Sequence, residues 1–496
     1  MALQEIGMAT RAAQRRERLY IDGEWLETEN AIPVSDLADG GTFAQVTAAD
    51  PAAAHAALEA AHEIKPRMRE TTVVERATWC ETIAEGLRER EEELAEVIVR
   101  EAGKPISSAR GEVGQAAERF DRAAEEARNV VSQGEYREGS TAGHEGWQAI
   151  VKHEPIGAVL CITPYNYPLA TTALQVAPAL AAGNSVLLKP ASKTPISAAI
   201  LADVISEVDG IPDGAFNFVP GEASEIGDVL SGDDRVNAIA MTGSSGAGKH
   251  VARESGMVNL HMELGGNAPA IVFEDADLAD VAGNCAKGSF KYAGQRCSAV
   301  SRVLAHESVH DELVDLIDGQ MDAWTAGDLF EEDTAFGPLI SVDQADWVET
   351  LVEDAVEKGA DLVRGGSRHA PEGVPDELGD QFFEPTLLAN VPHDARIVDE
   401  EQFGPIAVVT TFSDEEEAIE IANGSDLALD AAVFTNDHKR AMNVANRVDA
   451  GAVRINGAPS HGLGDIPFGG NKDSGIGREG LDASIHEMMR EKSIIL

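Results

Sequence analysis

The chain has 496 residues, 43% of them hydrophobic, so it is too long for one hydrophobic core and too apolar for a disordered protein. Its 86 Asp and Glu outnumber 39 Lys and Arg, and the net charge of −47 argues against a nucleic-acid partner because it repels phosphate backbones. The four cysteines show neither CxxC nor zinc-ligand spacing, so we expect no disulfide framework and no metal ion.

The first 18 residues are polar and mixed in charge, unlike a secretory leader. No run approaches the ~20 apolar residues that cross a bilayer. Together with the low cysteine content, these features favour a cytoplasmic protein without a membrane partner.

Acidic residues are spread in short patches, as at 89–96 and 414–417, rather than gathered in one tail. A solvated acidic surface is the simpler interpretation, and adaptation to high salt is the sharper one. We favour a halophilic protein, because at about 1 M salt the Debye length falls to roughly 3 Å and self-repulsion becomes tolerable.

The first predicted element of interest is a hairpin within residues 134–155, where Trp147, Ala149 and Val151 alternate with polar residues. From position 156 onward, short apolar runs alternate with amphipathic stretches, which is the pattern of βαβ units and a parallel sheet. We expect strands at 156–162, 185–188, 216–219 and 236–241, and helices at 170–182, 196–208 and 222–230.

A second alternating series follows position 267. It predicts strands at 270–273, 302–305, 431–434 and 451–455, and helices at 278–290, 311–324 and 344–358. Residues 365–380 are rich in Gly, Pro and acid and predict a surface loop. The fold class is therefore α/β with two parallel sheets. The apolar chain end, Ile494 to Leu496, is expected to pair with another surface.

Two glycine-flanked segments carry the chemistry. Glu263 precedes Leu264-Gly265-Gly266-Asn267, and Cys297 follows Gly294-Gln295-Arg296. A thiol attacks carbonyl carbon well, and a carboxylate can activate the water that later releases an acyl group. This pairing predicts acyl chemistry through a thioester. The other cysteines, Cys80, Cys161 and Cys285, lie in apolar or helical settings typical of inert core residues.

Over nearly its whole length the chain resembles the aldehyde dehydrogenase superfamily, and most of all the branch of lactaldehyde and non-phosphorylating glyceraldehyde-3-phosphate dehydrogenases. The resemblance implies two Rossmann-like domains: a cofactor-binding domain at 1–132 and 156–262, and a catalytic domain at 263–455. It further implies oligomerisation elements at 133–155 and 481–496, forming a homodimer or homotetramer, and a return segment at 456–480 that lines the active site.

The resemblance also assigns catalytic roles. It makes Cys297 the nucleophile, Glu263 the general base for thioester hydrolysis, and Asn166 a donor to the oxyanion of the thiohemiacetal, together with the backbone N–H of Cys297. A free thiol is only a few per cent ionised at neutral pH, so the site must help Cys297 to react. Partial burial of Glu263 would raise its pKa toward neutrality, which suits a base.

A nicotinamide cofactor is implied as the hydride acceptor. Lys189 is expected at the end of a strand, on the adenosine ribose. NAD-preferring relatives often carry a glutamate three positions later, where this chain has Ser192 followed by Lys193. An acid there would repel a 2′-phosphate and a hydroxyl beside a cation would accommodate it, so the sequence favours NADP over NAD.

The remaining cofactor contacts are assigned by the same resemblance. Gly243 and Ser244 begin a loop and helix that receive the pyrophosphate. The stretch from Gly243 also fits the GxxxxGK pattern of an ATPase, but His250 stands where a Mg²⁺-binding Ser or Thr belongs, so an ATPase is a minor alternative. The nicotinamide ribose and ring are expected to contact Glu401 and Phe403. The resemblance also assigns Thr163 and Pro164, which precede Asn166 in the sequence, to the cofactor site.

The substrate is a small-molecule aldehyde of small, polar or acidic character: lactaldehyde, glycolaldehyde, glyceraldehyde or its 3-phosphate, with short-chain semialdehydes as the alternative. Tyr167, Arg296 and His461 are the candidate substrate contacts. Arg296 can pair with a phosphate or carboxylate, or it can be a structural support of the Cys297 loop. His461 stands where an arginine would better suit a phosphate. A catalytically silent binding protein is the alternative from a different class.

Overall fold

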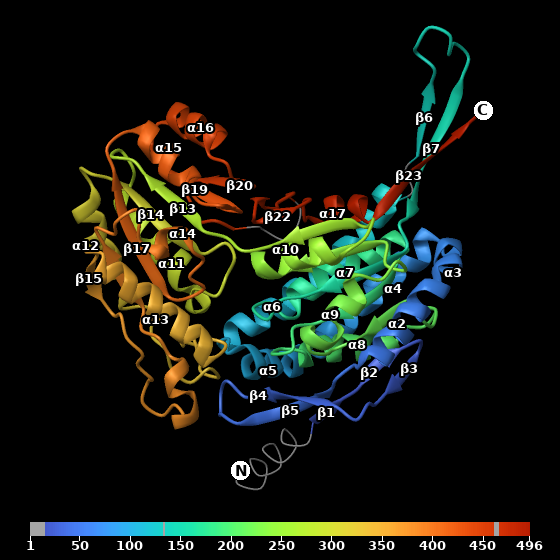
Figure 1. The fold of residues 1–496 in the computed structure, drawn as a ribbon, viewed down its shortest axis with the longest axis horizontal. Helices are drawn as coiled ribbons and strands as arrows, with labels where there is room; N and C mark the ends of the chain where they lie inside the picture. Colours follow the sequence, from blue (N-terminus) through green and yellow to red (C-terminus); the bar gives the residue numbers. More distant parts are fainter. Residues whose placement is uncertain (1–14, 132–133, 461–465) are drawn as a thin grey trace.

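Two large, mostly parallel sheets dominate the computed structural model, which describes residues 15–131, 134–460 and 466–496. Figure 1 shows them on opposite sides of the molecule, the second sheet with the orange α13 in front and the first with the green helices α9 and α10. The predicted α/β class with two parallel sheets is confirmed. None of the described helices has the length and apolar character needed to cross a membrane.

The first sheet has the order β22-β12-β11-β8-β9-β10-β2-β3. Four strands of its parallel core agree with the prediction to within a few residues: β8 (Ala158–Ile162), β9 (Ser185–Lys189), β10 (Phe216–Phe218) and β11 (Ala238–Thr242). The fifth parallel strand is β12 (Asn259–Glu263), which ends at Glu263. The connecting helices are α7 (Ala170–Ala182), α8 (Ile196–Ser206), α9 (Ala223–Ser231) and α10 (Ser245–Glu254). The antiparallel edge strands were not predicted: β2 (Leu19–Ile21), β3 (Glu24–Leu26) and β22 (Gly475–Ile476).

The strand order of this sheet reverses between β8 and β11. From β8 the chain moves outward through β9 and β10, and it then returns to place β11 and β12 on the other side of β8. In open α/β sheets, ligands bind outside the carboxyl ends of the strands at such a reversal. The segments that follow β8 and β11 are therefore where a ligand crevice is expected.

The second sheet has the order β15-β16-β17-β14-β13-β19-β20. The predicted strands are present as β13 (Ala268–Val272), β14 (Val300–His306), β19 (Asp430–Phe434) and β20 (Ala452–Ile455), and the predicted helices as α11 (Leu278–Phe290), α12 (His310–Met321) and α13 (Val342–Glu357). Not predicted were β15 (Asp361–Arg364), β16 (Thr386–Ala389), β17 (Ile406–Phe412), α14 (Arg396–Asp399), α15 (Glu415–Asn423) and α16 (His438–Arg447). The expected loop at 365–380 ends in a 3-10 helix, η3 (Asp376–Gln381).

Helices of the N-terminal third cover the first sheet. They are α2 (Pro51–Glu63), α3 (Lys65–Glu70), α4 (Val73–Glu89), α5 (Glu91–Ala102) and α6 (Ile106–Glu126), which continues into a π-helical turn, η1 (Ala127–Val131). They follow a small sheet of β1 (Arg15–Glu17), β5 (Thr42–Thr47) and β4 (Ala31–Ser35). Alanine-rich faces let α4, α6 and α7 share one core. Two short strands, β18 (Leu427–Ala428) and β21 (Asn471–Lys472), and the helix α17 (Leu481–Glu487) complete the chain.

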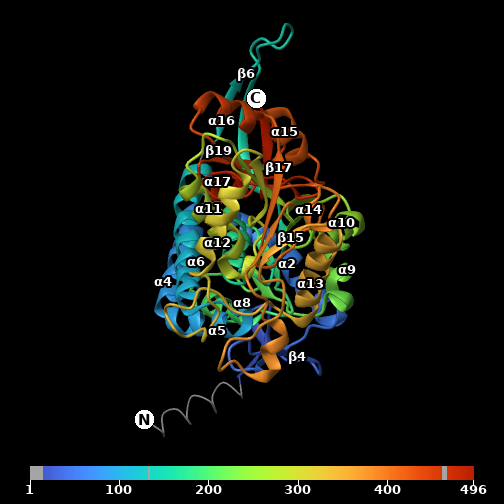
Figure 2. The ribbon, with the colours of Figure 1, turned by 90° about the vertical axis from the view of Figure 1, so that its left-hand side faces the viewer.

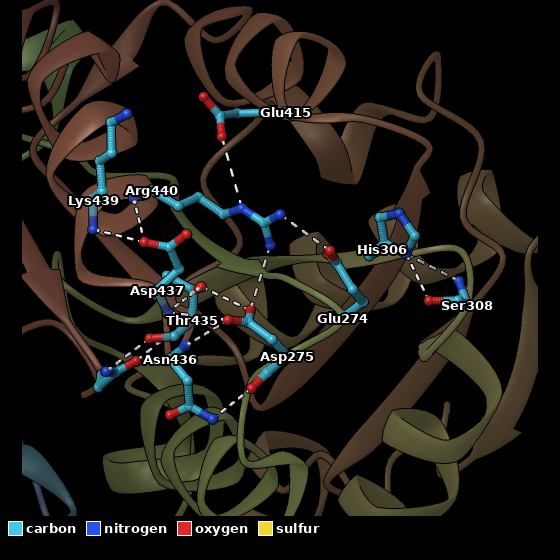
Figure 3. A network of polar contacts seen from close by, with 11 residues as sticks. Glu274, Asp275, His306, Ser308, Glu415, Thr435, Asn436, Asp437, Lys439 and Arg440 are labelled. Carbon is cyan, nitrogen blue, oxygen red and sulfur yellow. Dashed lines mark hydrogen bonds and ion pairs between the residues drawn. The ribbon is translucent and has the colours of Figure 1, made fainter.

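A polar network ties the loops after β13 and β19 together (Figure 3). The Asp275 carboxylate accepts hydrogen bonds from Thr435 Oγ1 at 2.7 Å and from the backbone N–H groups of Asn436 and Asp437 at 3.0 Å each. Asp437 in turn caps α16 through the Lys439 N–H at 2.8 Å. Because β13 and β19 are parallel neighbours, this network fixes the edge at which both strands end.

Another small sheet is built from β6 (Glu135–Glu138), β7 (Gln148–Pro155) and the C-terminal β23 (Met489–Ile495). It confirms the predicted hairpin and pairs the chain end with it. In Figures 1 and 2 this sheet projects away from both large sheets. Its exposed apolar side chains are Tyr136, Trp147, Ile150, Ile494, Ile495 and Leu496.

Candidate active site

A cavity of about 780 Å³ lies at the expected crevice, between the strand ends of the first sheet and the loops of the second. It brings together most of the residues singled out in the sequence. Those lining it are Thr163, Pro164, Asn166, Tyr167, Lys189, Ser192, Gly243, Ser244, Cys297, Glu401 and Phe403. Segments that are up to 240 positions apart in the sequence therefore share one site.

The Cys297 loop is held in a tightly constrained conformation. Tyr292 and Ala293 have φ of 56° and 51°, left-handed values that side chains seldom adopt. The Tyr292 hydroxyl anchors this turn by donating to the Ala102 carbonyl at 2.7 Å. The buried Gln295 accepts from the Ile340 N–H at 2.9 Å. These contacts stabilise a backbone that presents the Cys297 thiol to the cavity.

Asn166 lies beside the same loop. Its Nδ2 donates one hydrogen bond to the Gln295 carbonyl oxygen at 2.9 Å, and its Oδ1 accepts from the Tyr167 N–H at 3.0 Å. An amide nitrogen carries two hydrogens, and only one of those on Asn166 has an acceptor among the described residues, so the other can still be donated. The amide is therefore oriented by the backbone two residues before Cys297, and it can still donate to a group bound at that thiol.

Cys297 differs from the other three cysteines, which are fully buried. Poor solvation in the cavity raises the pKa of the Cys297 thiol, and the nearby carboxylates of Asp430, Glu263 and Glu401 raise it further. In the free protein the thiol is thus protonated at neutral pH. Formation of the reactive thiolate requires a base or a bound cation.

Glu263 ends β12 in a buried position, 4% exposed. Its Oε1 has no hydrogen-bond partner within the described part of the chain. A Cβ on Gly469 would lie 2.7 Å from that oxygen, so the glycine of the return segment leaves room for the carboxylate. Burial, and after it the negative charge of Glu479, raises the pKa of Glu263 well above its ordinary value. Such a carboxyl group can accept a proton near neutrality.

Behind Glu263 lies a charged cluster that the sequence did not reveal. His261, two residues earlier on the same face of β12, is buried between Glu487 (Nδ1 to Oε2, 2.6 Å) and Glu479 (Nε2 to Oε1, 3.7 Å). Burial opposes its charge, but the two carboxylates outweigh burial and raise the pKa of His261 to about 10. The positive charge of the His261 imidazolium offsets the negative charge of Glu479 next to Glu263, the candidate general base.

The start of α10 forms one part of the cavity wall. Ser244 is the N-cap of this helix, and its Oγ accepts from the Ala247 N–H at 3.3 Å. A helix N-terminus favours a bound anion. Lys249 does not face the cavity but forms an ion pair with Asp473. In an ATPase loop the equivalent lysine binds the nucleotide phosphates, whereas here Lys249 is paired with a carboxylate.

Glu401 and Phe403 line the same cavity as Ser244 and Cys297. Glu401 Oε1 accepts from the Gly266 N–H at 2.8 Å, and burial raises the pKa of Glu401 to about 7. The Glu401 carbonyl accepts from Trp347 Nε1 at 3.0 Å, and Gln344 binds the carbonyls of Gln402 and Phe403 at 3.1 Å each. Trp347 and Gln344 line the cavity and were not predicted, because they lie on the ordinary-looking amphipathic helix α13.

The cavity fits a dinucleotide. Its lining combines a buried lysine, Lys189, a helix N-terminus at Ser244, and the thiol of Cys297. Two buried hydroxyls beside it, Ser245 Oγ and Tyr165 Oη, lack partners among the described residues, so a bound polar group can satisfy them.

Of the three predicted substrate contacts, one is among the described residues that line the cavity. Tyr167 lines the cavity. Arg296 is not among the described lining residues, and its Nη2 donates to the Gly288 carbonyl at 2.7 Å, which supports the structural alternative over a substrate contact. His461 lies outside the described residues.

Known proteins share this architecture. The Aldehyde dehydrogenase family profile matches residues 25–494. Human mitochondrial succinate-semialdehyde dehydrogenase is 37% identical over 490 residues, covering 97% of this chain and 89% of the human protein.

Two crystal structures are similar along the whole chain. One is the NADP-dependent glyceraldehyde-3-phosphate dehydrogenase of Bacillus halodurans C-125 complexed with NADP (TM-score 0.93, 34% identity, 97% of this chain and 99% of that one). The other is the betaine aldehyde dehydrogenase of Staphylococcus aureus in complex with NAD+ (TM-score 0.92, 33% identity, 100% and 97%). The chain therefore belongs to the aldehyde dehydrogenase family and is an NAD(P)-dependent aldehyde dehydrogenase.

Proposed function

We propose that the enzyme oxidises a small polar or acidic aldehyde to its carboxylate through a thioester on Cys297. The observation that carries this proposal is the meeting of Cys297, the oriented amide of Asn166 and the dinucleotide-sized crevice in one cavity. A structural cysteine needs none of these neighbours.

In the first half-reaction, the Cys297 thiol releases its proton to solvent and Sγ bonds to the aldehyde carbon. The carbonyl oxygen becomes an oxyanion. It accepts one hydrogen bond from the second N–H of Asn166 Nδ2 and one from the backbone N–H of Cys297. One such donor typically contributes roughly 10²–10³ in rate. NAD(P)+, when bound, supplies the acceptor for the hydride that leaves the same carbon. Lys189, Ser244, Glu401 and Phe403, with Thr163, Pro164, Ser192 and Gly243 around them, would hold that cofactor.

In the second half-reaction, a thioester carbon on Cys297 accepts water. Glu263 takes a proton from that water as the water oxygen bonds to the carbonyl carbon, the C–S bond breaks, and Glu263 returns the proton to the leaving Sγ, so that the carboxylic acid is released and the thiol is restored. The raised pKa of Glu263 matches its basicity to this step. The role of Glu479 and His261 is to set the charge around Glu263 rather than to touch the substrate.

The test is a panel of aldehydes in high salt with each cofactor, followed by reduced-cofactor absorbance in a single turnover. We expect product with wild type and no product with Cys297→Ala. The matched control is Cys285→Ala, which removes a fully buried thiol on α11 and keeps activity. A Cys297→Ala enzyme that still reduces the cofactor would refute the proposal, and so would a folded wild type that binds cofactor but turns over no aldehyde, as a silent binding protein would.

For the substrate we propose small polar aldehydes, with short-chain semialdehydes as the second candidate. The support is a cavity lined by Tyr167 and Asn166 near the thiol, together with the semialdehyde-oxidising human relative. Because Arg296 binds the Gly288 carbonyl, a phosphate on the substrate would need another cation. The aldehyde panel therefore includes glyceraldehyde with and without its 3-phosphate.

We further propose that the protein works as a cytoplasmic homodimer or homotetramer, with oligomer contacts at residues 133–155 and 481–496. The support for assembly is the projecting sheet of β6, β7 and β23, whose exposed Trp147, Ile495 and Leu496 are poorly suited to water. The four free thiols support a reducing compartment. Truncation after residue 488 should lower the mass found by light scattering to that of a monomer.

The sequence-based preference for NADP rests on Ser192 and Lys193, and the similar crystal structures contain NADP in one case and NAD+ in the other. The structure adds one carboxylate that bears on this choice.

A further inference from the structure

The carboxylate of Glu222 lies next to Ser192, one of the residues that line the cavity. Ser192, three residues after Lys189, directs its Oγ toward two acceptors: Glu222 Oε2 at 3.2 Å and the Gly221 carbonyl at 3.2 Å. A hydroxyl has one hydrogen to donate. With both neighbours accepting, the Ser192 hydroxyl is committed within the protein, and its free lone pairs do not attract a phosphate.

The side chain of Glu222 does not stabilise the helix that follows it. It occupies the N-cap position of α9, but its side chain makes no capping hydrogen bond. The next residue, Ala223, lines the cavity. The Glu222 carboxylate is exposed and lies close enough to the buried Lys189 to oppose the effect of burial on the pKa of that lysine. Lys189, Ser192 and Glu222 thus form one cluster from two loops of the first sheet.

Lys193, the cation expected to receive a 2′-phosphate, has its own acidic neighbour. Burial lowers the pKa of Lys193, and Asp343 in the first turn of α13 acts in the opposite direction. Lys189, which lines the cavity, and Lys193, which follows Ser192 in the sequence, are therefore each accompanied by a carboxylate. A phosphate dianion bound beside Ser192 would be repelled by Glu222, whose carboxylate oxygen lies 3.2 Å from Ser192 Oγ.

We propose that Glu222 selects the cofactor, favouring NAD+ over NADP+, because its carboxylate can accept hydrogen bonds from the ribose hydroxyls and repels a 2′-phosphate. The inference rests on the proposed function of this cavity. It places on the loop before α9 the acid that other dinucleotide-binding proteins carry elsewhere for the ribose 2′-hydroxyl. It also reverses the NADP preference expected from Ser192 and Lys193 alone.

The test is isothermal titration calorimetry of NAD+ and of NADP+ with wild type, Glu222→Gln and Glu225→Gln. Glu225 is an exposed acid in the first turn of the same helix, so its variant removes an equal charge without touching Ser192. We expect wild type to bind NAD+ at least about 10-fold more tightly than NADP+, a ratio that a nearby like charge readily produces. Glu222→Gln should tighten NADP+ binding by about 10-fold, and Glu222→Lys should invert the preference.

The outcomes separate the two claims. Equal binding of the two cofactors by wild type, or an equal effect of the Glu222 and Glu225 variants, would overturn the inference and leave the aldehyde-oxidising function standing. Failure of wild type to bind either nucleotide would overturn the proposed function and the inference with it. Because Glu222 is exposed, its variants are expected to fold, and their melting temperatures check this.

Discussion

Gly266 lies directly against the carbonyl of Cys297: a Cβ built on Gly266 would be 2.1 Å from the Cys297 oxygen. The same glycine donates its N–H to Glu401 Oε1 at 2.8 Å. One residue without a side chain therefore joins the segment after Glu263, the nucleophile loop and the loop that carries Glu401. The absence of a side chain at Gly266 lets its backbone approach the backbone of Cys297 closely.

We predict that Gly266→Ala lowers kcat by about 100-fold or more, because a shift of the Cys297 backbone by about 1 Å misplaces the thiol. Gly283→Ala is the matched control: it sits in α11 with nothing within 4 Å of the added methyl group. That change should leave kcat intact and stabilise the helix by about 0.5–1 kcal/mol. Steady-state kinetics and thermal melts measure both effects, and equal activity of the two variants would contradict the close packing.

Alkylation of the free enzyme should be confined to Cys297, since Cys80, Cys161 and Cys285 are fully buried. Because burial and the carboxylates around it raise the pKa of Cys297, its reaction with iodoacetamide should accelerate with pH up to at least about pH 9 without levelling off. Mass spectrometry of peptides after timed quenching gives the rate. A plateau below pH 8 would show a stabilised thiolate and refute this expectation.

Glu479→Gln should move the acidic limb of the kcat–pH profile to lower pH. Glu263 must be ionised to act as a base, so the rate rises as pH passes through its pKa. Burial raises that pKa first and the charge of Glu479 raises it further, so neutralising Glu479 lowers it. The control, Asp482→Asn, changes an exposed acid on α17 and should not move the limb. An unchanged or higher midpoint for Glu479→Gln would mean that Glu479 does not act on Glu263.

Stability should increase with salt. The net charge of −47 implies strong self-repulsion, which KCl at about 1–2 M screens to within a few ångströms. We expect the melting temperature to rise as KCl increases from about 0.1 M to 2 M, and more than in sucrose of equal osmolality. Some acidic residues stabilise the fold locally. Glu91 and Glu415 lie in the first turns of α5 and α15, where the positive end of the helix dipole favours a carboxylate. A melting temperature that falls with KCl would reject halophilic adaptation.

Local pattern alone determined much of this protein. The helices at 170–182 and 278–290 begin and end where the sequence predicts. Burial of one face imposes a helical period on 278–290, whereas 170–182 is buried on nearly every side and ends at Gly183, which has a left-handed φ of 92°. Glycine-flanked Cys297 and the strand-end position of Lys189 also identified two residues that line the cavity. The edge strands β2 and β22 were invisible, since two or three residues carry too little pattern to predict a strand.

Only the tertiary structure decided which charges meet. Glu479 lies near Glu263 and His261, and Glu222 contacts Ser192, although the partners come from different segments of the chain. Arg296 turned toward Gly288 for the same kind of reason: its neighbour was provided by a folded helix and not by its position beside Cys297. Periodicity reports which face of an element is buried, whereas electrostatic energy depends on distances between elements, and those distances follow from strand order.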